Sequence, residues 1–230
     1  MPIGYSNWKN FCLDLRDTEL YTWQLDKGIA ITSSDGVYGI PYVVEGYGII
    51  YNDAIMQKYF ALSSKAVSFS SMEEVDNFDK LKAVVEDMTR HKDDLEIEGV
   101  FASTSFGSGE DWRWQTHLAN VPVYFAFRDK NISDTDTLDF TYAENYKNIF
   151  DLYIGNSCTI PTALSKKSVS DSMEEFALEK AAMVQNGNWA WSQIASVEDN
   201  KVLEENVKYL PLYMGIDGEE SQGLCIGTAF

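Results

Sequence analysis

Four tryptophans stand in two W-x-W pairs, each just after a glycine-containing loop. Trp112 and Trp114 lie in G-S-G-E-D-W-R-W-Q, and Trp189 and Trp191 lie in Q-N-G-N-W-A-W-S-Q. In an α-helix, residues two positions apart point about 200° away from each other. One tryptophan of each pair can therefore pack in a core while the other faces a ligand.

The neighbours at helical spacing indicate which tryptophans pack. Trp114 shares a helix face with Leu118, and Trp191 shares one with Ile194, so both are expected in the core. The partners of the other two are polar: Gln115 and Thr116 for Trp112, and Ser192 and Gln193 for Trp189. An aromatic ring on a polar face beside a loop is better explained by a ligand than by packing, although tryptophans at a domain contact remain the alternative.

Carboxylates near these tryptophans suggest the kind of ligand. An indole face stacks on the C–H face of a sugar, while carboxylates accept hydrogen bonds from its hydroxyls. The expected ligand-binding residues are Glu45, Glu110, Asp111, Trp112 and Trp189.

Two other functions remain open. Glu45 with Glu110 or Asp111 could supply the acid and nucleophile of a glycosidase. Acidic groups with aromatic rings could also hold a cation, such as a peptide or polyamine.

The composition argues against several other classes. There are 36 carboxylates against 18 Lys and Arg, a net charge of −18, which would repel nucleic acid. Three scattered cysteines and only two histidines, His91 and His117, predict neither a disulfide scaffold nor a metal site, and we expect no cofactor. Both histidines lie on predicted helices and are interpreted as surface or packing residues. No apolar run reaches the ~18 residues of a membrane helix.

Strand patterns alternate with helix patterns, which predicts an α/β fold. Strands are expected within 36–51 and at 99–104, 181–185, 207–212 and 223–226, and helices near 52–59, 71–90, 110–120, 142–153, 171–177 and 189–195. Ser71-Met-Glu-Glu74 and Asp171-Ser-Met-Glu174 are expected to cap two of these helices. Asn186-Gly187 is expected to form a turn. Loops at the carboxyl ends of the strands would form a binding crevice, with Trp112 and Trp189 on its rim.

Four segments in this order resemble the extracellular carbohydrate-binding proteins of ABC importers, the maltose-binding-protein type. They are G-I-P-Y-V-V-E-G-Y-G-I-I-Y-N, G-E-D-W-R-W, F-A-L-E-K-A-A-M-V-Q-N-G-N-W-A-W and Y-L-P-L. The third matches the pattern F-x-x-G-x-x-A-M-x-x-N-G-x-W-A-W, with Glu179 in place of the usual glycine. The resemblance runs from Asp14 to Gly227.

The resemblance implies a periplasmic-binding-protein type II-like fold in which two α/β lobes close on a sugar. Residues 1–43 would be a remnant of the first lobe, 44–205 the second lobe and 206–230 the return crossing, with a hinge at Pro41 and Gly46. Glu45 would be the hinge carboxylate, Glu110 and Trp112 the acid and aromatic of one loop, and Trp189 the stacking aromatic. Asp111 replaces the proline of the maltose-type pattern, so the resemblance leaves the sugar unspecified.

The resemblance also implies a substrate-binding component rather than an enzyme, with a carbohydrate ligand and a membrane permease as partners. The full-length protein would lie at the extracellular face of the cell membrane or in the periplasm. The chain lacks a signal peptide and is interpreted as a fragment. We expect this fragment to bind sugars weakly or not at all, and to self-associate through exposed edges and apolar surface.

Overall fold

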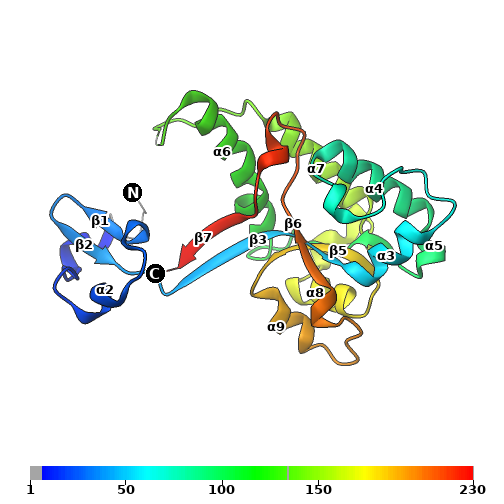
Figure 1. Cartoon of the computed structure of the whole chain (residues 1–230), viewed down its shortest axis with the longest axis horizontal. Coiled ribbons are helices and arrows are strands. Elements are labelled where there is room, and N and C mark those ends of the chain that lie inside the picture. The colour runs from blue at the N-terminus through cyan, green and yellow to red at the C-terminus, as the bar shows by residue number, and fades with distance from the viewer. Residues whose placement is uncertain (1–6, 134, 230) are drawn as a thin grey trace. The chain divides into compact units, whose positions relative to one another are not determined.

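The computed structural model describes residues 7–133 and 135–229 (Figure 1). The chain divides into two compact units, which we call the short unit (residues up to 46 and from 226) and the large unit (residues 47–225). The strands β3 (Val43–Asn52) and β7 (Cys225–Ala229) each contribute residues to both. The lobe boundaries expected near 43 and 205 stay a prediction.

The short unit contains little regular structure. Its elements are η1 (Lys9–Phe11), α2 (Glu19–Trp23), η2 (Lys27–Ile29), β1 (Ile31–Ser33) and β2 (Gly36–Gly39). The two strands pair antiparallel, with Ser33 opposite Gly36. Thr18 caps α2 by accepting a hydrogen bond from the backbone of Tyr21 at 3.3 Å. No residue of α2 is buried.

A mixed sheet forms the centre of the large unit. Its strand order is β4 (Gly99–Phe101), β5 (Ala181–Gly187), β3 and β6 (Val207–Leu210), and β7 also pairs with β3. β4 and β5 run parallel, whereas β3 runs antiparallel to both β5 and β6. The predicted α/β class is therefore confirmed.

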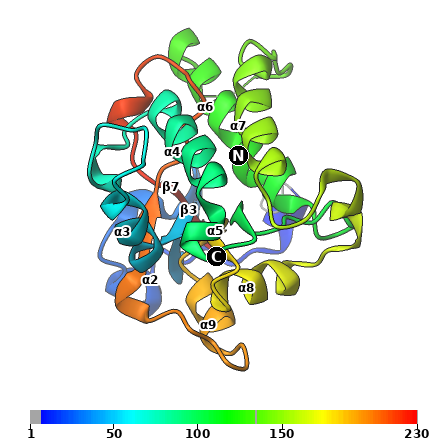
Figure 2. The same ribbon diagram turned by 90° about the vertical axis from the view of Figure 1, so that its right-hand side faces the viewer.

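Helices cover both faces of this sheet (Figure 2). One face carries α3 (Asp53–Ala61), α4 (Phe78–Arg90), α5 (Lys92–Leu95), η4 (Arg113–Leu118), α6 (Ala119–Lys130) and α7 (Ala143–Gly155), and the other carries α8 (Val169–Ala177) and α9 (Ala190–Ala195). Short 3-10 turns complete the unit: η3 (Met72–Glu74), η5 (Pro161–Lys166), η6 (Glu204–Asn206) and η7 (Glu219–Ser221). Because strand side chains alternate, Ile49 and Tyr51 join the first core and Ile50 joins the second.

The first expected helix cap was placed wrongly. Ser71 makes no capping hydrogen bond, and Glu74 instead accepts from the backbone of Ser70 at 2.8 Å. The buried Val75 then takes an extended backbone and ends this turn. Helix α4 begins only at Phe78, where the Asn77 side chain accepts from the backbone of Lys80.

The second expected cap was displaced by three residues. Ser168 is the N-cap of α8, and Asp171 is the acidic member of its capping box, since each side chain bonds the other's backbone N–H. At the far end of α8, Glu179 adopts a left-handed φ of 60°. Glycine carries no penalty in this conformation, which gives a physical reason for the glycine of the family pattern.

Candidate functional site

The segment that carries Trp112 is wound differently from the helix that its sequence predicts. Residues Arg113–Leu118 form η4, a π-helix, which continues directly into α6. In a π-helix the hydrogen bonds join residues five apart, so residues five apart lie on one face. Trp112 consequently shares its face with His117, whereas Gln115 and Thr116 are exposed.

Trp189 is placed by the end of strand β5. The strand continues through Asn186 and Gly187, with Gly187 opposite Tyr47, so the expected Asn-Gly turn is wrong and the chain turns one residue later. A side chain at Gly187 would overlap the Trp189 ring, because a Cβ there would lie 2.1 Å from Cζ3. The backbone φ of Gly187 is negative, so the conformation does not call for glycine. Glycine is favoured here because the Trp189 ring is folded against this residue.

Four rings from three separate segments of the large unit come together as an aromatic cluster. Its members are Tyr47, Trp112, His117 and Trp189. The ring centroids of Trp112 and Trp189 are 6.5 Å apart, at an interplanar angle of 48°. His117 stacks on Tyr47 at 3.9 Å and lies 4.9 Å from Trp112 and 5.6 Å from Trp189. The structure therefore brings together the two tryptophans that the sequence assigned to a ligand.

The other two tryptophans pack as expected. Trp114 is buried and contacts Phe106 and Phe150, with ring centroids 5.6 and 4.7 Å away. Trp191 packs against the second core, which contains Ile194. The division of each W-x-W pair into one core residue and one cluster residue holds in the structure.

The acidic residues beside Trp112 have structural partners. Glu110 is half-buried, and its Oε2 accepts a hydrogen bond from the backbone N–H of Val169 at 2.7 Å, at the start of α8. The Asp111 carboxylate accepts from the Gln115 side chain. Each carboxylate retains a second oxygen with which it could accept from a ligand.

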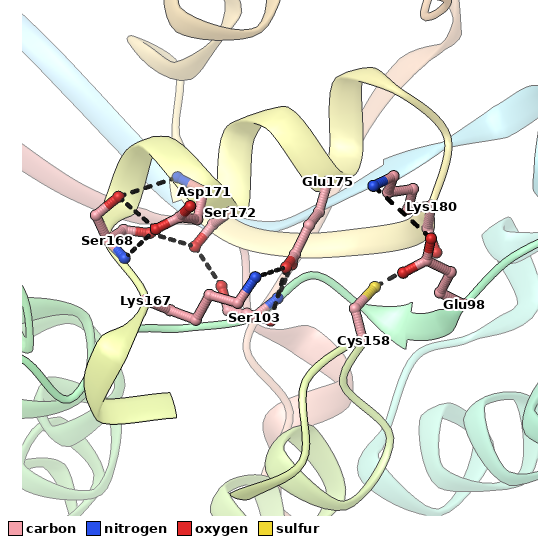
Figure 3. Close-up of polar contacts among 9 residues, drawn as sticks. All are labelled: Glu98, Ser103, Cys158, Lys167, Ser168, Asp171, Ser172, Glu175 and Lys180. Carbon is pink, nitrogen blue, oxygen red and sulfur yellow. Dashed lines mark hydrogen bonds and ion pairs between the residues drawn. The ribbon is translucent and has the colours of Figure 1, made fainter. Parts of the chain in front are cut away.

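A part-buried ion pair fixes the loop after β4 to the same helix. Figure 3 shows Ser103 and Lys167 both reaching the Glu175 carboxylate. Ser103 donates its backbone N–H at 2.6 Å and its hydroxyl at 3.0 Å, and Lys167 Nζ lies 2.8 Å away. Because Glu110 also bonds α8, both ends of the loop that leads to Trp112 are anchored on one helix.

Three further residues of interest belong to the short unit. Glu45 lies in β3 and is half-buried, Pro41 lies in the coil before β3, and Gly46 is the last residue before the large unit. The roles assigned to these three residues stay predictions. In the described residues, no group of three His, Cys, Asp or Glu side chains is arranged to hold a metal ion.

Comparison with known proteins identifies the family. The model of the family described as bacterial extracellular solute-binding protein matches residues 3–229. The chain belongs to this family. A search of curated protein sequences found no match. No helix in residues 7–133 or 135–229 is long and apolar enough to cross a membrane.

Solved structures of other solute-binding proteins have the same fold. Maltose-bound MalE3 of T. maritima is 14% identical, with a TM-score of 0.63 over 96% of this chain and 52% of that one. Raffinose-bound RafE is 16% identical, with a TM-score of 0.61 over 94% and 53%. A protein of xylan utilization from Caldanaerobius polysaccharolyticus is 15% identical, with a TM-score of 0.62 over 97% and 54%. This solute-binding chain spans about half the length of the structures that it matches.

One residue that the sequence interpretation missed is Arg113. It is fully buried, and its three guanidinium nitrogens have no hydrogen-bond partner among the described residues. Its Cζ lies 4.9 Å from the Trp112 ring centroid, a cation–π contact. Burial lowers the pKa of Arg113, while Tyr153 and Glu110 oppose that shift. The guanidinium therefore places a positive charge directly beside the aromatic cluster.

The other missed residue is His117, which the sequence assigned to the surface or to packing. Burial, together with the charge of Arg113, lowers its pKa to about 4. On an α-helix, His117 would point about 140° away from Trp112, which hid their proximity. The sequence feature that could have indicated irregular winding is Pro122. Because proline has no N–H, it cannot donate the α-helical hydrogen bond to the carbonyl of Leu118, the last residue of η4.

Proposed function

We propose that this chain is part of the substrate-binding component of an ABC sugar importer, and that Trp112 and Trp189 stack on a mono- or oligosaccharide. The observation that carries the proposal is the approach of these two indoles to within 6.5 Å between centroids. They come from the starts of two different helices, and Gly187 makes room for one of them. Such convergence of aromatic rings suits the apolar faces of a pyranose.

The ligands of structural neighbours support a carbohydrate. RafE is solved in complex with raffinose and MalE3 with maltose bound, and a further neighbour is a chitin oligosaccharide binding protein. The carboxylates of Glu110 and Asp111 would accept hydrogen bonds from sugar hydroxyls through the oxygens not used in the loop. Glu45 would add a further carboxylate from the hinge strand.

The buried Arg113 disfavours the polyamine alternative. A guanidinium 4.9 Å from the Trp112 centroid already uses the electrostatic attraction of that indole. A second cation stacked on the same ring would be repelled by the first. A neutral sugar meets no such repulsion.

A binding role also fits the carboxylates better than glycoside hydrolysis does. A glycosidase needs one carboxyl group for proton transfer and another for attack at the sugar. Glu110 instead holds the start of α8, and Asp111 holds a side chain of its own helix. Turnover of aryl glycosides by the full-length protein would contradict the binding role.

The remaining parts of the proposal concern the whole protein. It would lie on the extracellular face of the membrane or in the periplasm and would deliver its sugar to a permease. Closure of two lobes on the sugar would signal the loaded state. Because this chain spans about half of its structural relatives, we expect weak binding by the chain alone.

Indole resonances in NMR spectra of the 230-residue chain provide the test. Xylobiose, raffinose, maltose, chitobiose and spermidine would be titrated separately at millimolar concentrations. We expect one sugar to shift the indole N–H signals of Trp112 and Trp189 and to leave that of the buried Trp114 unchanged. Shifts with spermidine alone would favour the amine alternative.

Substitutions assign the binding to the cluster. Trp112→Ala and Trp189→Ala should each weaken binding of the best sugar about 2- to 10-fold, the loss of one stacking ring, whose free energy is about 0.5–1.5 kcal/mol. Trp23→Ala is the matched control, because Trp23 is an exposed tryptophan of the short unit. Equal affinity in all three variants would place the sugar elsewhere.

A further inference from the structure

His117 occupies the middle of the aromatic cluster. One face of its imidazole stacks on Tyr47, with an interplanar angle of 12° and centroids 3.9 Å apart. Trp112 meets it edge-on at 77°, and Trp189 is tilted by 59°. The ring is half-buried, so part of it remains open to solvent beside the two indoles. Any ligand stacked on those indoles would lie next to the imidazole.

A single hydrogen bond orients this ring. Gln185 Nε2 lies 3.0 Å from His117 Nδ1. Gln185 is 1% exposed, and its backbone N–H donates to the Tyr153 hydroxyl at 3.0 Å. The backbone that carries this side chain is therefore held in place in β5. In the described residues no hydrogen bond engages Nε2 of His117, and Gln185 Oε1 is buried without a partner.

The bond to Gln185 determines what the other imidazole nitrogen can do. When the amide donates to Nδ1, the imidazole proton resides on Nε2, which can then donate to an acceptor. When the amide is turned so that Oε1 accepts from Nδ1, the lone pair is on Nε2, which then accepts a hydrogen bond. A hydroxyl group both donates and accepts, so it fits either state.

The imidazole is neutral at physiological pH. Burial is the main cause of its low pKa of about 4, and the neighbouring Arg113 charge adds to it, while the bond to Gln185 opposes it. A neutral ring keeps one donor and one acceptor nitrogen. It also keeps a second positive charge away from the cluster, where Arg113 already provides one.

We propose that His117 is a third sugar-contacting residue, which stacks within the aromatic cluster and hydrogen-bonds a hydroxyl of the bound sugar through Nε2 while Gln185 holds Nδ1. This inference rests on the proposed function, which it deepens: one residue supplies both apolar ring surface and a polar atom. The solute is then a neutral hydroxylated ring, with a hydroxyl in reach of Nε2 when its faces lie on the indoles.

Two variants separate the roles of the imidazole. His117→Phe keeps an aromatic ring on Tyr47 and removes both nitrogens, whereas His117→Gln keeps an amide donor and acceptor near Nε2 and removes the ring. Each should bind the best sugar of the panel about five- to tenfold more weakly than the parent chain, the effect of one lost hydrogen bond or contact. Gln185→Met keeps the imidazole but removes the hydrogen bond that selects its tautomer, and should weaken sugar binding less than either His117 variant.

The direct readout is the nitrogen-15 signal of the His117 imidazole during the titration with xylobiose, raffinose, maltose and chitobiose. We expect Nε2 to shift with the same saturation curve as the Trp112 and Trp189 indole signals. A role in packing alone would leave Nε2 unshifted by sugar. Near-ultraviolet circular dichroism checks that the variants fold. If a variant does not fold, the Nε2 shift measured in the parent chain still tests the proposal.

The outcomes distinguish this inference from the proposed function. Indole shifts with an unchanged Nε2 signal, and parental affinity in His117→Phe, would overturn the role of His117 and leave the sugar site intact. Absence of indole shifts with every sugar would overturn the proposed function and this inference together. Coupled shifts of all three rings would support both.

Discussion

The two units of this chain use similar residues with opposite results. In the large unit, aromatic and aliphatic side chains from both faces of the sheet form two cores. In the short unit, Val37 is the one buried large apolar side chain among residues 7–46 for which burial is described. Many of its other large apolar residues lie exposed, among them Trp8, Phe11, Leu13, Leu20 and Trp23.

The difference shows that apolar sequence alone does not produce a core. The strands of the large unit have helices packed on both faces, whereas β1 and β2 pair with no other strand of the described part of the chain. An isolated two-stranded sheet is marginally stable in water. The short unit therefore has the apolar side chains of a folded domain without the elements that would cover them.

Amide hydrogen exchange should give the largest contrast between the units. We expect amides of β5 (Ala181–Gly187) to exchange about a thousandfold or more slowly than those of β1 and β2, because β5 is buried throughout its length. Mass spectrometry of peptic fragments would measure both. Comparable protection in the two regions would mean that the short unit is covered in solution, as self-association through its apolar side chains would produce.

Tryptophan deletion gives a matched comparison. Trp114 is 4% exposed and Trp23 is 67% exposed. Trp114→Ala should lower the free energy of unfolding by about 3–5 kcal/mol, because it removes an indole from a packed core. Trp23→Ala should change it by about 0.5 kcal/mol or less. Urea titrations followed by far-ultraviolet circular dichroism would measure both, and similar losses would show that the short unit packs Trp23.

Two arginines in different environments provide a third contrast. Arg113 is buried and has no hydrogen-bond partner within 7–133 and 135–229, whereas Arg16 is exposed and paired with Asp14. Because an unpaired buried charge is costly, Arg113→Met should raise the free energy of unfolding by about 1–4 kcal/mol. Arg16→Met should leave it nearly unchanged, because an exposed ion pair contributes little. Destabilisation by Arg113→Met would instead reveal a bound partner of the guanidinium, such as an ordered water.

The smallest expected effect is the loss of the ion pair between Arg16 and Asp14 in the short unit. The hydrogen bonds from Arg16 to Asp14 lower the pKa of this carboxyl to about 2. A carboxyl whose pKa is lowered on folding stabilises the fold above its unfolded pKa of about 4, and this contribution disappears as the pH falls toward 2. Carbon-13 NMR of Asp14 should therefore titrate near pH 2, and in Arg16→Met near pH 4. A normal pKa in the parent chain would mean that this contact does not form.

Much of the large unit could be predicted from the sequence, because the spacing of apolar residues indicates which side chains are buried. The alternation of strand and helix patterns gave the fold class, and helical spacing correctly divided Trp114 from Trp112 and Trp191 from Trp189. The family resemblance agreed with this placement of Trp112 and Trp189 and supplied the glycine otherwise expected at Glu179. The helix caps failed at Ser71 and Asp171, because several neighbouring polar residues could equally accept the free backbone N–H groups.

The cluster itself could be predicted only in part. His117 packs by stacking on Tyr47, as one of the two expectations had it, but an α-helical spacing cannot reveal a π-helix, so its place beside Trp112 could not be predicted. Arg113 carried no signal of burial, since arginine is a surface residue in most proteins. Gly187 was taken as a turn former, but the space that it leaves is filled by Trp189, a contact that local sequence does not encode.

The π-helix η4 behaves like an α-helix into which one residue has been inserted, and this lets the site tolerate a change of chain length. Removing one residue, Gln115 or Thr116, would restore ordinary winding and place Trp112 four residues before His117, still on one face of the helix. The two rings would therefore stay neighbours with either winding. A protein with this helix can thus gain or lose one residue between Trp112 and His117 without separating the two rings.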